Sequence, residues 1–496
     1  MPPFGPPSSV VVAGRARRSR AADWPCAGQR GPHAAADGSS DAWHLGYHAG
    51  SWHRRAATRL RRRGLVGVCA TTMRTLIVAD DYPWPPTSGS RLRLRMVAAG
   101  LARCGPVDLV SVVPSGRTDL DGPGPEVERA EVVRLPAGLR GPLSGRLVPW
   151  ALPVDVAGWR CPPVARTVSA LLDASGDGQR WGGYELVWWS GVHAWVAGGG
   201  FGFGAGTTPP AVVDVDDLDD EKARRRPGPR LGDPDAPAAR RLVAPVRKAS
   251  SRLAVELEVR QWRRLYRATG RRGLVAVVCS DLDARRAAGK GFARVEVVPN
   301  GYPAPSRPAG RTVVGTPPTV LFPGTLRYPP NADGARWLVD DVAPELRRSV
   351  PDARVRLVGR FDPAQRSLDD RPQVDLVGPV PDMAGELARA DLVVVPLRYG
   401  SGTRVKILEA FAHRVPVVST TVGAEGLGVE SGRHLLLADA PAGFAEACAR
   451  LLVDAELRRR LAEAAHAHFL DRFESEVVEE RVASLASAVA ADGCGT

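Results

Sequence analysis

Residues 319–358 read TVLFPGTLRYPPNADGARWLVDDVAPELRRSVPDARVRLV, and this stretch decides the fold class. Its pattern predicts a short buried strand over 319–322, a helix over 332–348 and a second strand over 354–358. Two strands joined by a helical crossover of this length pair in parallel. The stretch therefore predicts an open α/β sheet whose ligand-binding loops follow the carboxyl ends of the strands.

The same alternation runs through both halves of the chain, which predicts two Rossmann-like domains facing one another. The Pro-rich stretch Pro303–Pro318 marks the boundary between a domain over 73–302 and a domain over 303–474, and we expect a final helix over 475–496 to pack back on the first domain. Further strands are expected at 74–79, 107–113, 185–189, 211–215, 274–279, 295–298, 374–377, 391–395 and 415–419, helices at 91–103, 382–390 and 404–413, and loops at 114–160 and 226–240.

Composition excludes several classes of protein. The chain has 496 residues, 44% hydrophobic and 24% charged, which is typical of a globular protein of about two domains. No apolar run approaches the ~18 residues that span a bilayer. Seven scattered cysteines without a CxxC pair argue against a disulfide framework or a zinc site. They indicate a reducing compartment, so we expect a cytoplasmic protein.

The net charge of +13 is concentrated at the N-terminus, where residues 1–72 hold eleven Arg and three Asp. This Arg-, Pro- and Gly-rich segment lacks apolar periodicity, whereas ordered patterning begins at Met73. We expect residues 1–72 to be a disordered extension, or translated sequence upstream of a start at Met73. The alternative is a basic arm for anionic surfaces or nucleic acid.

Dinucleotide binding is disfavoured by the glycine pattern. The turn after the first strand, ADDYPWPPTSGSR over 79–91, lacks GxGxxG. The run GGGFGFGAG over 198–206 contains only a variant of that motif, and it neither follows an expected strand nor opens an expected helix.

Residues 398–427, RYGSGTRVKILEAFAHRVPVVSTTVGAEGL, contain the most informative candidate site. A loop of Gly400, Ser401 and Gly402 precedes a helix that opens near Thr403 or Arg404. Free backbone N–H groups and the positive end of a helix dipole suit a diphosphate at such a loop. Lys406 could then neutralise phosphate while Glu409 accepts hydrogen bonds from vicinal hydroxyls. The alternative is a plain i,i+3 ion pair.

This segment resembles the donor site of the retaining GT-B glycosyltransferases of family GT4, whose loop and helix carry two glutamates eight positions apart. Glu409 matches the glutamate that holds the nucleotide ribose, whereas Ser401 stands in place of the glutamate that contacts the sugar. The family's Arg and Lys for the diphosphate fall on Thr325 and Asn331. The arrangement of Gly402, Thr403, Arg404, Lys406, Glu409 and Ala410 is similar to a branch associated with exopolysaccharide synthesis. We hypothesise that Arg404 and Lys406 replace the missing charge.

The resemblance implies further site residues. On the donor side these are Gly324 and Glu425. On the acceptor side, the loop with Ser88, Gly89 and Ser90 corresponds to the family's Gly-rich loop. Asp216 stands where family members often carry a catalytic histidine, so its role is open. His193 could face the site or be a structural histidine. Asn300-Gly301 resembles the NG that closes the first domain.

The implied activity is transfer of a hexose from a nucleotide-diphosphate sugar to a glycan or lipid-linked acceptor, with retention and without metal or other cofactor. The string DVDDLDDEK, residues 214–222, could instead be a metal-binding DxD motif of the GT-A type, although the two-domain pattern favours GT-B. Two other functions stay open. One is a sugar-nucleotide epimerase of the same fold. The other is a non-catalytic protein that binds a sugar or nucleotide, and Ser401 in place of the family's glutamate is the feature that supports it.

Residues 240–272 combine eleven Arg or Lys with interleaved apolar side chains at Leu253, Leu257, Trp262, Leu265 and Tyr266. Such a helix can lie on an anionic membrane surface, which would make the protein peripheral to the membrane. The alternative is a solvated Arg-rich helix. We expect no nucleic-acid partner, because no binding motif accompanies the charge.

Overall fold

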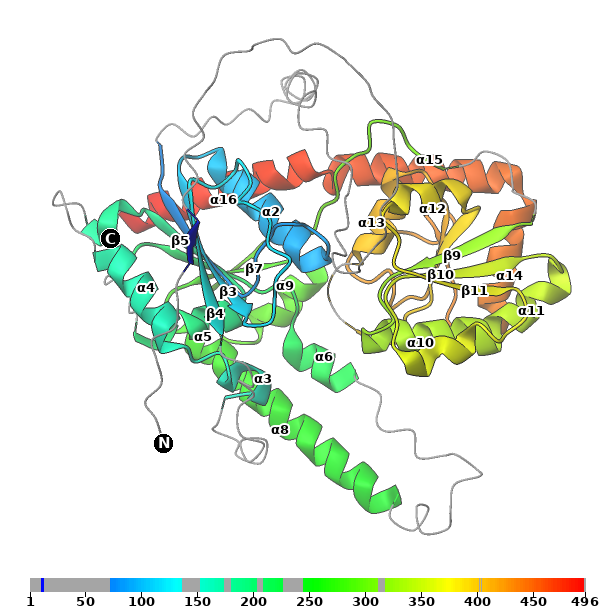
Figure 1. Cartoon of the computed structure of the whole chain (residues 1–496), viewed down its shortest axis with the longest axis horizontal. Helices are drawn as coiled ribbons and strands as arrows, with labels where there is room; N and C mark the ends of the chain where they lie inside the picture. The colour runs from blue at the N-terminus through cyan, green and yellow to red at the C-terminus, as the bar shows by residue number, and fades with distance from the viewer. Residues whose placement is uncertain are drawn as a thin grey trace, which may run out of the picture.

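The protein, seen in a computed structural model, consists of two parallel-sheet α/β domains (Figure 1). The structure describes residues 10–12, 72–135, 152–173, 180–202, 208–225, 244–310, 317–400, 402 and 404–494. The N-terminal domain, blue to green in Figure 1, holds eight strands within this part of the chain, and the C-terminal domain, yellow to orange, holds six.

The N-terminal sheet is parallel apart from one edge strand, and its order is β1-β4-β3-β2-β5-β6-β7-β8. Its strands are β1 (Val10–Val12), β2 (Thr75–Ala79), β3 (Val107–Pro114), β4 (Arg129–Leu135), β5 (Leu186–Ser190), β6 (Ala211–Asp214), β7 (Val275–Val278) and β8 (Arg294–Val297). Its helices are α2 (Gly89–Ala102), α3 (Val154–Ala157), α4 (Pro162–Asp173), α5 (Val192–Ala197), α6 (Asp219–Arg225), α8 (Ala244–Gly270) and α9 (Asp281–Ala288), with short 3₁₀ turns at Arg180–Gly183 and Gly200–Gly202.

The C-terminal sheet is parallel throughout, in the order β11-β10-β9-β12-β13-β14. Its strands are β9 (Thr319–Pro323), β10 (Arg354–Val358), β11 (Val374–Gly378), β12 (Leu392–Val395), β13 (Val417–Ser419) and β14 (Leu436–Leu437). Its helices are α10 (Pro329–Trp337), α11 (Ala343–Ser349), α12 (Met383–Arg389), α13 (Val405–Ala412), α14 (Pro441–Val453) and α15 (Ala455–Arg472).

The last helix, α16 (Ser475–Cys494), returns to the N-terminal domain and packs on α2 (Figure 1). Gly100 makes the close approach possible, since a Cβ at this position would lie 2.6 Å from the Val482 Cβ. Arg103 and Glu480 form an ion pair of 2.8 Å beside this contact. One helix of the C-terminal end of the chain thus contributes to the core of the first domain.

The structure corrects three details of the expected elements. Strand β4 lies inside the stretch 114–160 that we expected to be loop. The pattern did not indicate a strand because charged residues separate its buried positions (Ala130, Val132, Val133, Leu135). The expected helix 332–348 is divided into α10, a π turn over Leu338–Val342 and α11. Pro344 has no N–H to donate to the preceding turn, which accounts for the break in the hydrogen-bond ladder.

The third correction concerns the N-terminal extension. Val10–Val12 forms the edge strand β1, antiparallel to β4, although we expected disorder throughout residues 1–72. Residues 1–9 and 13–71 lie outside the described part of the chain.

Helix α8 places most of its apolar side chains in the domain core. Leu257, Trp262, Leu265 and Tyr266 are buried, whereas Leu253 is 59% exposed. The apolar residues that suggested a membrane-facing stripe therefore mainly stabilise the fold, and contact with a membrane surface stays a prediction. Among the described residues, no helix combines the length and the apolar character that a membrane span needs.

Candidate functional site between the two sheets

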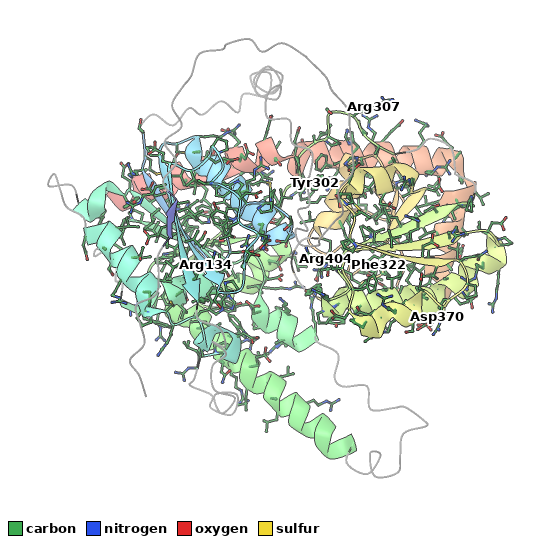
Figure 2. All side chains as sticks on the ribbon, viewed as in Figure 1. Arg134, Tyr302, Arg307, Phe322, Asp370 and Arg404 are labelled. Atoms are coloured by element: carbon green, nitrogen blue, oxygen red, sulfur yellow. The ribbon has the colours of Figure 1, made fainter. Side chains whose placement is uncertain are left out.

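Loops at the carboxyl ends of the two sheets meet where the domains face each other. A Cβ on Gly89, at the start of α2, would lie 3.3 Å from Val405 Cγ2 at the start of α13. The Tyr302 hydroxyl, near the domain boundary, donates to Glu409 Oε1 over 2.8 Å. Tyr302 and Arg404 both lie at this junction (Figure 2). The topology thus brings together the loops expected to bind ligand.

The loop before α13 is shaped by two glycines with positive φ. Gly400 (φ +128°) lies against Arg404, since a Cβ there would be 2.7 Å from the Arg404 Nη2 atom. Gly402 (φ +78°) approaches the Asp217 carboxylate of the other domain. Arg404 itself is buried and is the residue before the first turn of α13. The predicted donor residues Ser401 and Thr403 lie outside the described residues.

Lys406 reaches across from α13 to the loop after β9. Its Nζ donates to Asn331 Oδ1 over 2.9 Å, and Asn331 Nδ2 donates to the Thr325 carbonyl over 2.8 Å. Gly324 (φ +140°) leaves room for this contact, because a Cβ there would lie 2.8 Å from Lys406 Nζ. The same ammonium lies 4.6 Å from the centre of the Phe322 ring. The four predicted residues Gly324, Thr325, Asn331 and Lys406 thus form one cluster.

The electrostatics of this cluster favour an incoming anion. Burial, and then the nearby Arg404 guanidinium, lower the pKa of Lys406 to about 7. Burial raises the pKa of Glu409 to about 7, although the Tyr302 hydroxyl and Lys406 act against that rise. Two cationic side chains held close together in a partly desolvated place would be relieved by a bound phosphate.

Glu425 connects the domains. It accepts from Arg286 Nη2 over 2.6 Å and from both terminal guanidinium nitrogens of Arg225, Nη1 and Nη2. Burial alone would raise its pKa, but the hydrogen bonds from Arg225 and Arg286 outweigh burial and lower it to about 2. The predicted donor residue Glu425 is therefore already engaged by two arginines of α6 and α9.

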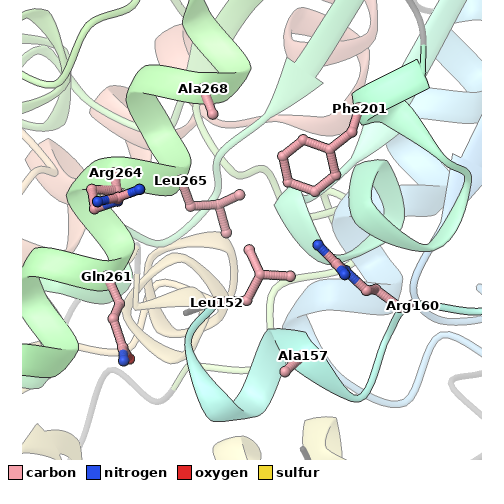
Figure 3. Close-up of a pocket in the computed structure, with 8 residues that line it drawn as sticks. All are labelled: Leu152, Ala157, Arg160, Phe201, Gln261, Arg264, Leu265 and Ala268. Carbon is pink, nitrogen blue, oxygen red and sulfur yellow. The ribbon is translucent and has the colours of Figure 1, made fainter. Parts of the chain in front are cut away.

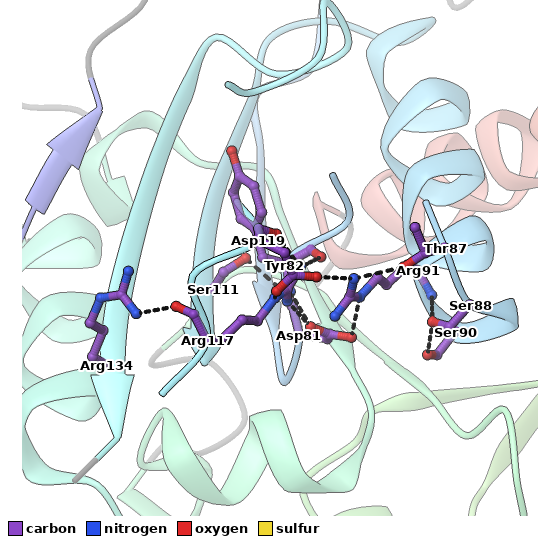
Figure 4. Close-up of polar contacts among 10 residues, drawn as sticks. All are labelled: Asp81, Tyr82, Thr87, Ser88, Ser90, Arg91, Ser111, Arg117, Asp119 and Arg134. Atoms are coloured by element: carbon purple, nitrogen blue, oxygen red, sulfur yellow. Dashed lines mark hydrogen bonds and ion pairs between the residues drawn. The ribbon is translucent and has the colours of Figure 1, made fainter. Parts of the chain in front are cut away.

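The Ser88–Ser90 loop is supported by a polar network behind it (Figure 4). Ser88 caps α2 by accepting from the Arg91 backbone N–H, and its hydroxyl lies 3.0 Å from the Ser90 hydroxyl. Arg91 holds Asp81 at 3.0 Å and Asp119 at 3.1 Å, and Arg117 also pairs with Asp81. Contacts within the N-terminal domain thus hold the loop in place, and Gly89 lies close to Val405 of α13.

Asp80 is a candidate that our sequence analysis missed. It follows β2 directly, and burial together with the neighbouring Asp81 raises its pKa to about 7. His193 Nδ1 lies 3.9 Å from Asp80 Oδ2. Burial lowers the pKa of His193 to about 4, and its ring packs edge-on against Trp159 and Trp262. The position of Asp80 at a strand's carboxyl end was the signal that could have identified it.

Asp216 belongs to a network organised by the buried Arg93. Asp216 Oδ1 accepts from Asn300 Nδ2 over 2.8 Å and from the Cys279 thiol over 2.6 Å. Arg93 binds Asp214 through two hydrogen bonds of 2.6 and 2.9 Å and also donates to Asn300 Oδ1. The Asp216 side chain is 37% exposed, so it lies at the surface of an otherwise buried network.

Two other aspartates of the DVDDLDDEK string are paired with cations. Asp217 lies 3.6 Å from Lys222, and the buried Asp220 lies 2.5 Å from Lys290. Burial raises the pKa of Asp219 to about 7. In the part of the chain that the structure describes, no three His, Cys, Asp or Glu side chains gather as a candidate metal site.

The sequence over residues 317–454 matches the family "Glycosyl transferases group 1". This region contains β9 to β14 and the Lys406 cluster. The chain therefore carries a group 1 glycosyl transferase domain. The resemblance predicted from the residues of this half is confirmed at that level, while the narrower GT4 assignment stays a prediction.

Individual curated proteins are also similar in sequence to part of this chain. An exopolysaccharide phosphotransferase of Streptomyces coelicolor is 30% identical over 202 residues, which are 38% of this chain and 20% of that protein. The chain spans between a fifth and about a third of the length of the curated relatives it matches.

Solved structures confirm the GT-B fold around the group 1 glycosyl transferase domain. Sucrose-phosphate synthase from Thermosynechococcus elongatus has a TM-score of 0.58 at 17% identity, covering 85% of this chain and all of that one. HepE from Anabaena, in complex with UDP and glucose, has a TM-score of 0.52 at 17% identity, covering 84% of this chain and all of that one. At this identity the likeness concerns the fold.

Proposed function

We propose that this protein transfers a hexose from a nucleoside-diphosphate sugar to a glycan or lipid-linked acceptor, with retention of anomeric configuration and without a metal ion. One observation carries the proposal: the Lys406 ammonium lies 2.9 Å from the side chain of Asn331. Asn331 is the position at which the GT4 resemblance expects a diphosphate-binding lysine. Lys406 of α13 thus contacts the residue that stands in place of that lysine, and we propose that it takes over the lysine's charge.

The geometry suggests how the leaving group is stabilised. Negative charge develops on the diphosphate as the glycosidic bond breaks, and cations already in place lower the energy of that state. Lys406 and the buried Arg404 are such cations, at the N-terminal end of α13. Glu409, held by the Tyr302 hydroxyl, is positioned to accept hydrogen bonds from a ribose.

UDP-glucose is the first donor to test. The HepE structure, which shares the fold, contains UDP and glucose. The base and the sugar that this chain prefers are properties of loop side chains, so GDP- and ADP-sugars belong in the same screen.

The N-terminal side offers groups that suit an acceptor hydroxyl. Asp80, Asp216 and His193 lie at or beyond the carboxyl ends of β2, β6 and β5. We propose that they orient the acceptor, while the departing phosphate takes the acceptor proton. The anomeric configuration of the product, read by NMR, tests this. Inversion would instead point to a carboxylate such as Asp80 acting as the base.

An exchange of the two cluster residues tests the donor site. In the Lys406→Asn variant we expect the affinity for UDP-glucose to fall by about tenfold or more. Thermal stabilisation and calorimetry in EDTA measure this affinity. Adding Asn331→Lys should restore much of the affinity, because the ammonium returns to the same place from the other loop. Arg336→Gln, an exposed arginine of α10, is the matched control. Full affinity in Lys406→Asn would contradict the proposed site.

Product analysis separates the remaining functions. A transferase releases UDP when a suitable acceptor is present. An epimerase changes the sugar without releasing UDP. Binding without turnover across an acceptor panel would favour the non-catalytic binding protein.

A further inference from the structure

A pocket of about 460 Å³ lies in the N-terminal domain between α3, the turn Gly200–Gly202 and α8 (Figure 3). None of its lining residues belongs to the proposed donor or acceptor site. Its volume is in the range of pockets that hold small molecules, about 300–1,000 Å³. The domain therefore has a place for a second ligand that the proposed transfer reaction does not use.

Helix α8 builds one wall with a regular stripe. Gln261, Arg264, Leu265 and Ala268 all line the pocket, and their spacing of three, four and seven places them on one face of the helix. Leu265 is 2% exposed and anchors this wall in the domain core. The wall is thus rigid and not an accidental gap between loops.

Three lining residues outside α8 are apolar. Leu152, Ala157 and Phe201 face α8 across the pocket, so the cavity can bury a hydrocarbon or aromatic body. Each methylene that leaves water there contributes ~0.8 kcal/mol to binding.

Two guanidinium groups flank this apolar lining. Figure 3 shows Arg160 and Arg264 on opposite sides of the pocket, with Leu152 and Leu265 between them. Arg160 lies over the Phe201 ring at 5.8 Å from its centre. Within the described residues, no carboxylate pairs with Arg160 or Arg264. By contrast, Arg74, Arg91, Arg93 and Arg117 of the same domain all pair with aspartates.

We propose that this pocket binds an anionic amphiphile: a phosphate between Arg160 and Arg264, with an apolar chain on the lining. Guanidinium groups bind phosphate through charge-assisted hydrogen bonds. The phosphate could belong to a lipid headgroup or to a soluble phosphorylated hydrophobe, and both share this chemistry. The proposal goes beyond the transfer reaction and does not depend on it.

Octyl phosphate, titrated into the full chain by calorimetry, is the direct probe. We expect saturable binding to one site, and much weaker binding of octanol or inorganic phosphate alone. The Arg160→Gln/Arg264→Gln variant should weaken octyl phosphate by about tenfold or more. Arg260→Gln, an exposed arginine of the same helix outside the pocket, should leave binding unchanged. Absence of saturable binding, or equal binding in the double variant, overturns the proposal.

Two further arms complete the test. Ala268→Trp, checked for folding by circular dichroism, should block octyl phosphate by filling the cavity; unaltered binding in a folded variant counts against the pocket. Phosphatidylcholine vesicles with and without phosphatidic acid identify the source of the phosphate. Phosphatidic acid binding that the double variant loses assigns a lipid, whereas octyl phosphate binding alone assigns a soluble ligand. UDP-glucose affinity should persist in all these variants, which separates this site from the donor site.

Discussion

The two sides of the domain junction differ in how their charged side chains are compensated. On the N-terminal side, the carboxylates of Asp214 and Asp220 are paired internally with Arg93 and Lys290. On the C-terminal side, Lys406 donates to a neutral amide and lies close to a second cation, Arg404. The first arrangement stabilises the fold without a ligand, whereas the second has an electrostatic cost that a bound phosphate would relieve. Substitutions on the two sides should therefore have opposite effects on stability.

The largest effect is expected from Arg93→Met. Removing the buried guanidinium leaves Asp214 uncompensated, which should lower the free energy of unfolding by about 3–5 kcal/mol. Urea denaturation measures it. Arg93→Met combined with Asp214→Asn should recover much of the loss, since the buried charge is then also gone. A loss below about 1 kcal/mol would mean that the acidic side does not depend on its internal cation.

Lys406→Met should act in the opposite direction on stability while it damages binding. Losing a charge-assisted hydrogen bond to the diphosphate should cost about 1.5–3 kcal/mol of UDP-glucose affinity. The melting temperature should rise, because the pKa of Lys406 is lowered from its usual 10.5 and the charged form is disfavoured in the fold.

The stability gain of Lys406→Met also has a predicted pH dependence. It should be largest below pH 7, where Lys406 is charged, and should shrink as pH rises from 7 towards 10.5. Melting curves at several pH values measure it. A Lys406→Met variant that is less stable than wild type at pH 6 would contradict the proposed difference between the two sides of the junction.

UDP-glucose affinity should pass through a maximum near pH 7. Above that pH Lys406 loses its charge, so affinity should fall by up to about tenfold per pH unit. Below it Glu409 becomes protonated and is a poorer acceptor for the ribose hydroxyls. Calorimetry from pH 5.5 to 8.5 tests this, as the diphosphate diester stays ionised throughout. Lys406→Met should flatten the alkaline side, and an unchanged profile would exclude Lys406 as the titrating group.

The smallest effect on stability is expected at the contact between the two domains formed by Glu425 with Arg225 and Arg286. Glu425→Gln removes the charge that holds Arg225 and Arg286, and should lower the free energy of unfolding by about 1 kcal/mol. The pKa of Glu425 is depressed to about 2, so this contribution should be present above pH 4.5 and be lost as pH falls towards 2. The difference between wild type and variant should also shrink in salt. A difference that is constant from pH 7 to 3 would contradict it.

Much of the architecture could be predicted because it depends on local pattern. Runs such as 392–395 are buried on both faces of a parallel sheet and read as continuous apolar segments. Strand β4 escaped prediction because charged residues interrupt it and Pro and Gly surround it. Helix was found in the region expected over 332–348, but its division by the π turn Leu338–Val342 was not anticipated.

The residue types of the proposed donor site also followed from the sequence, since a Gly-rich loop before a helix with Arg404, Lys406 and Glu409 is a local motif. Which atoms meet did not follow from it. Lys406 contacts Asn331 over a separation of 75 residues, and Glu425 meets Arg225 over 200. Those distances depend on how two sheets and two domains pack.

The sequence by itself determined a two-domain α/β chain with a cationic loop and helix, because strand and helix periods and turn chemistry act over a few residues. Only the tertiary structure decided that the Lys406 ammonium contacts Asn331 and that Asp80 lies beside His193. It also decided that Arg160 and Arg264 flank one pocket. Side chains far apart in sequence come together only when the hydrophobic cores of both domains fix the positions of their helices and strands.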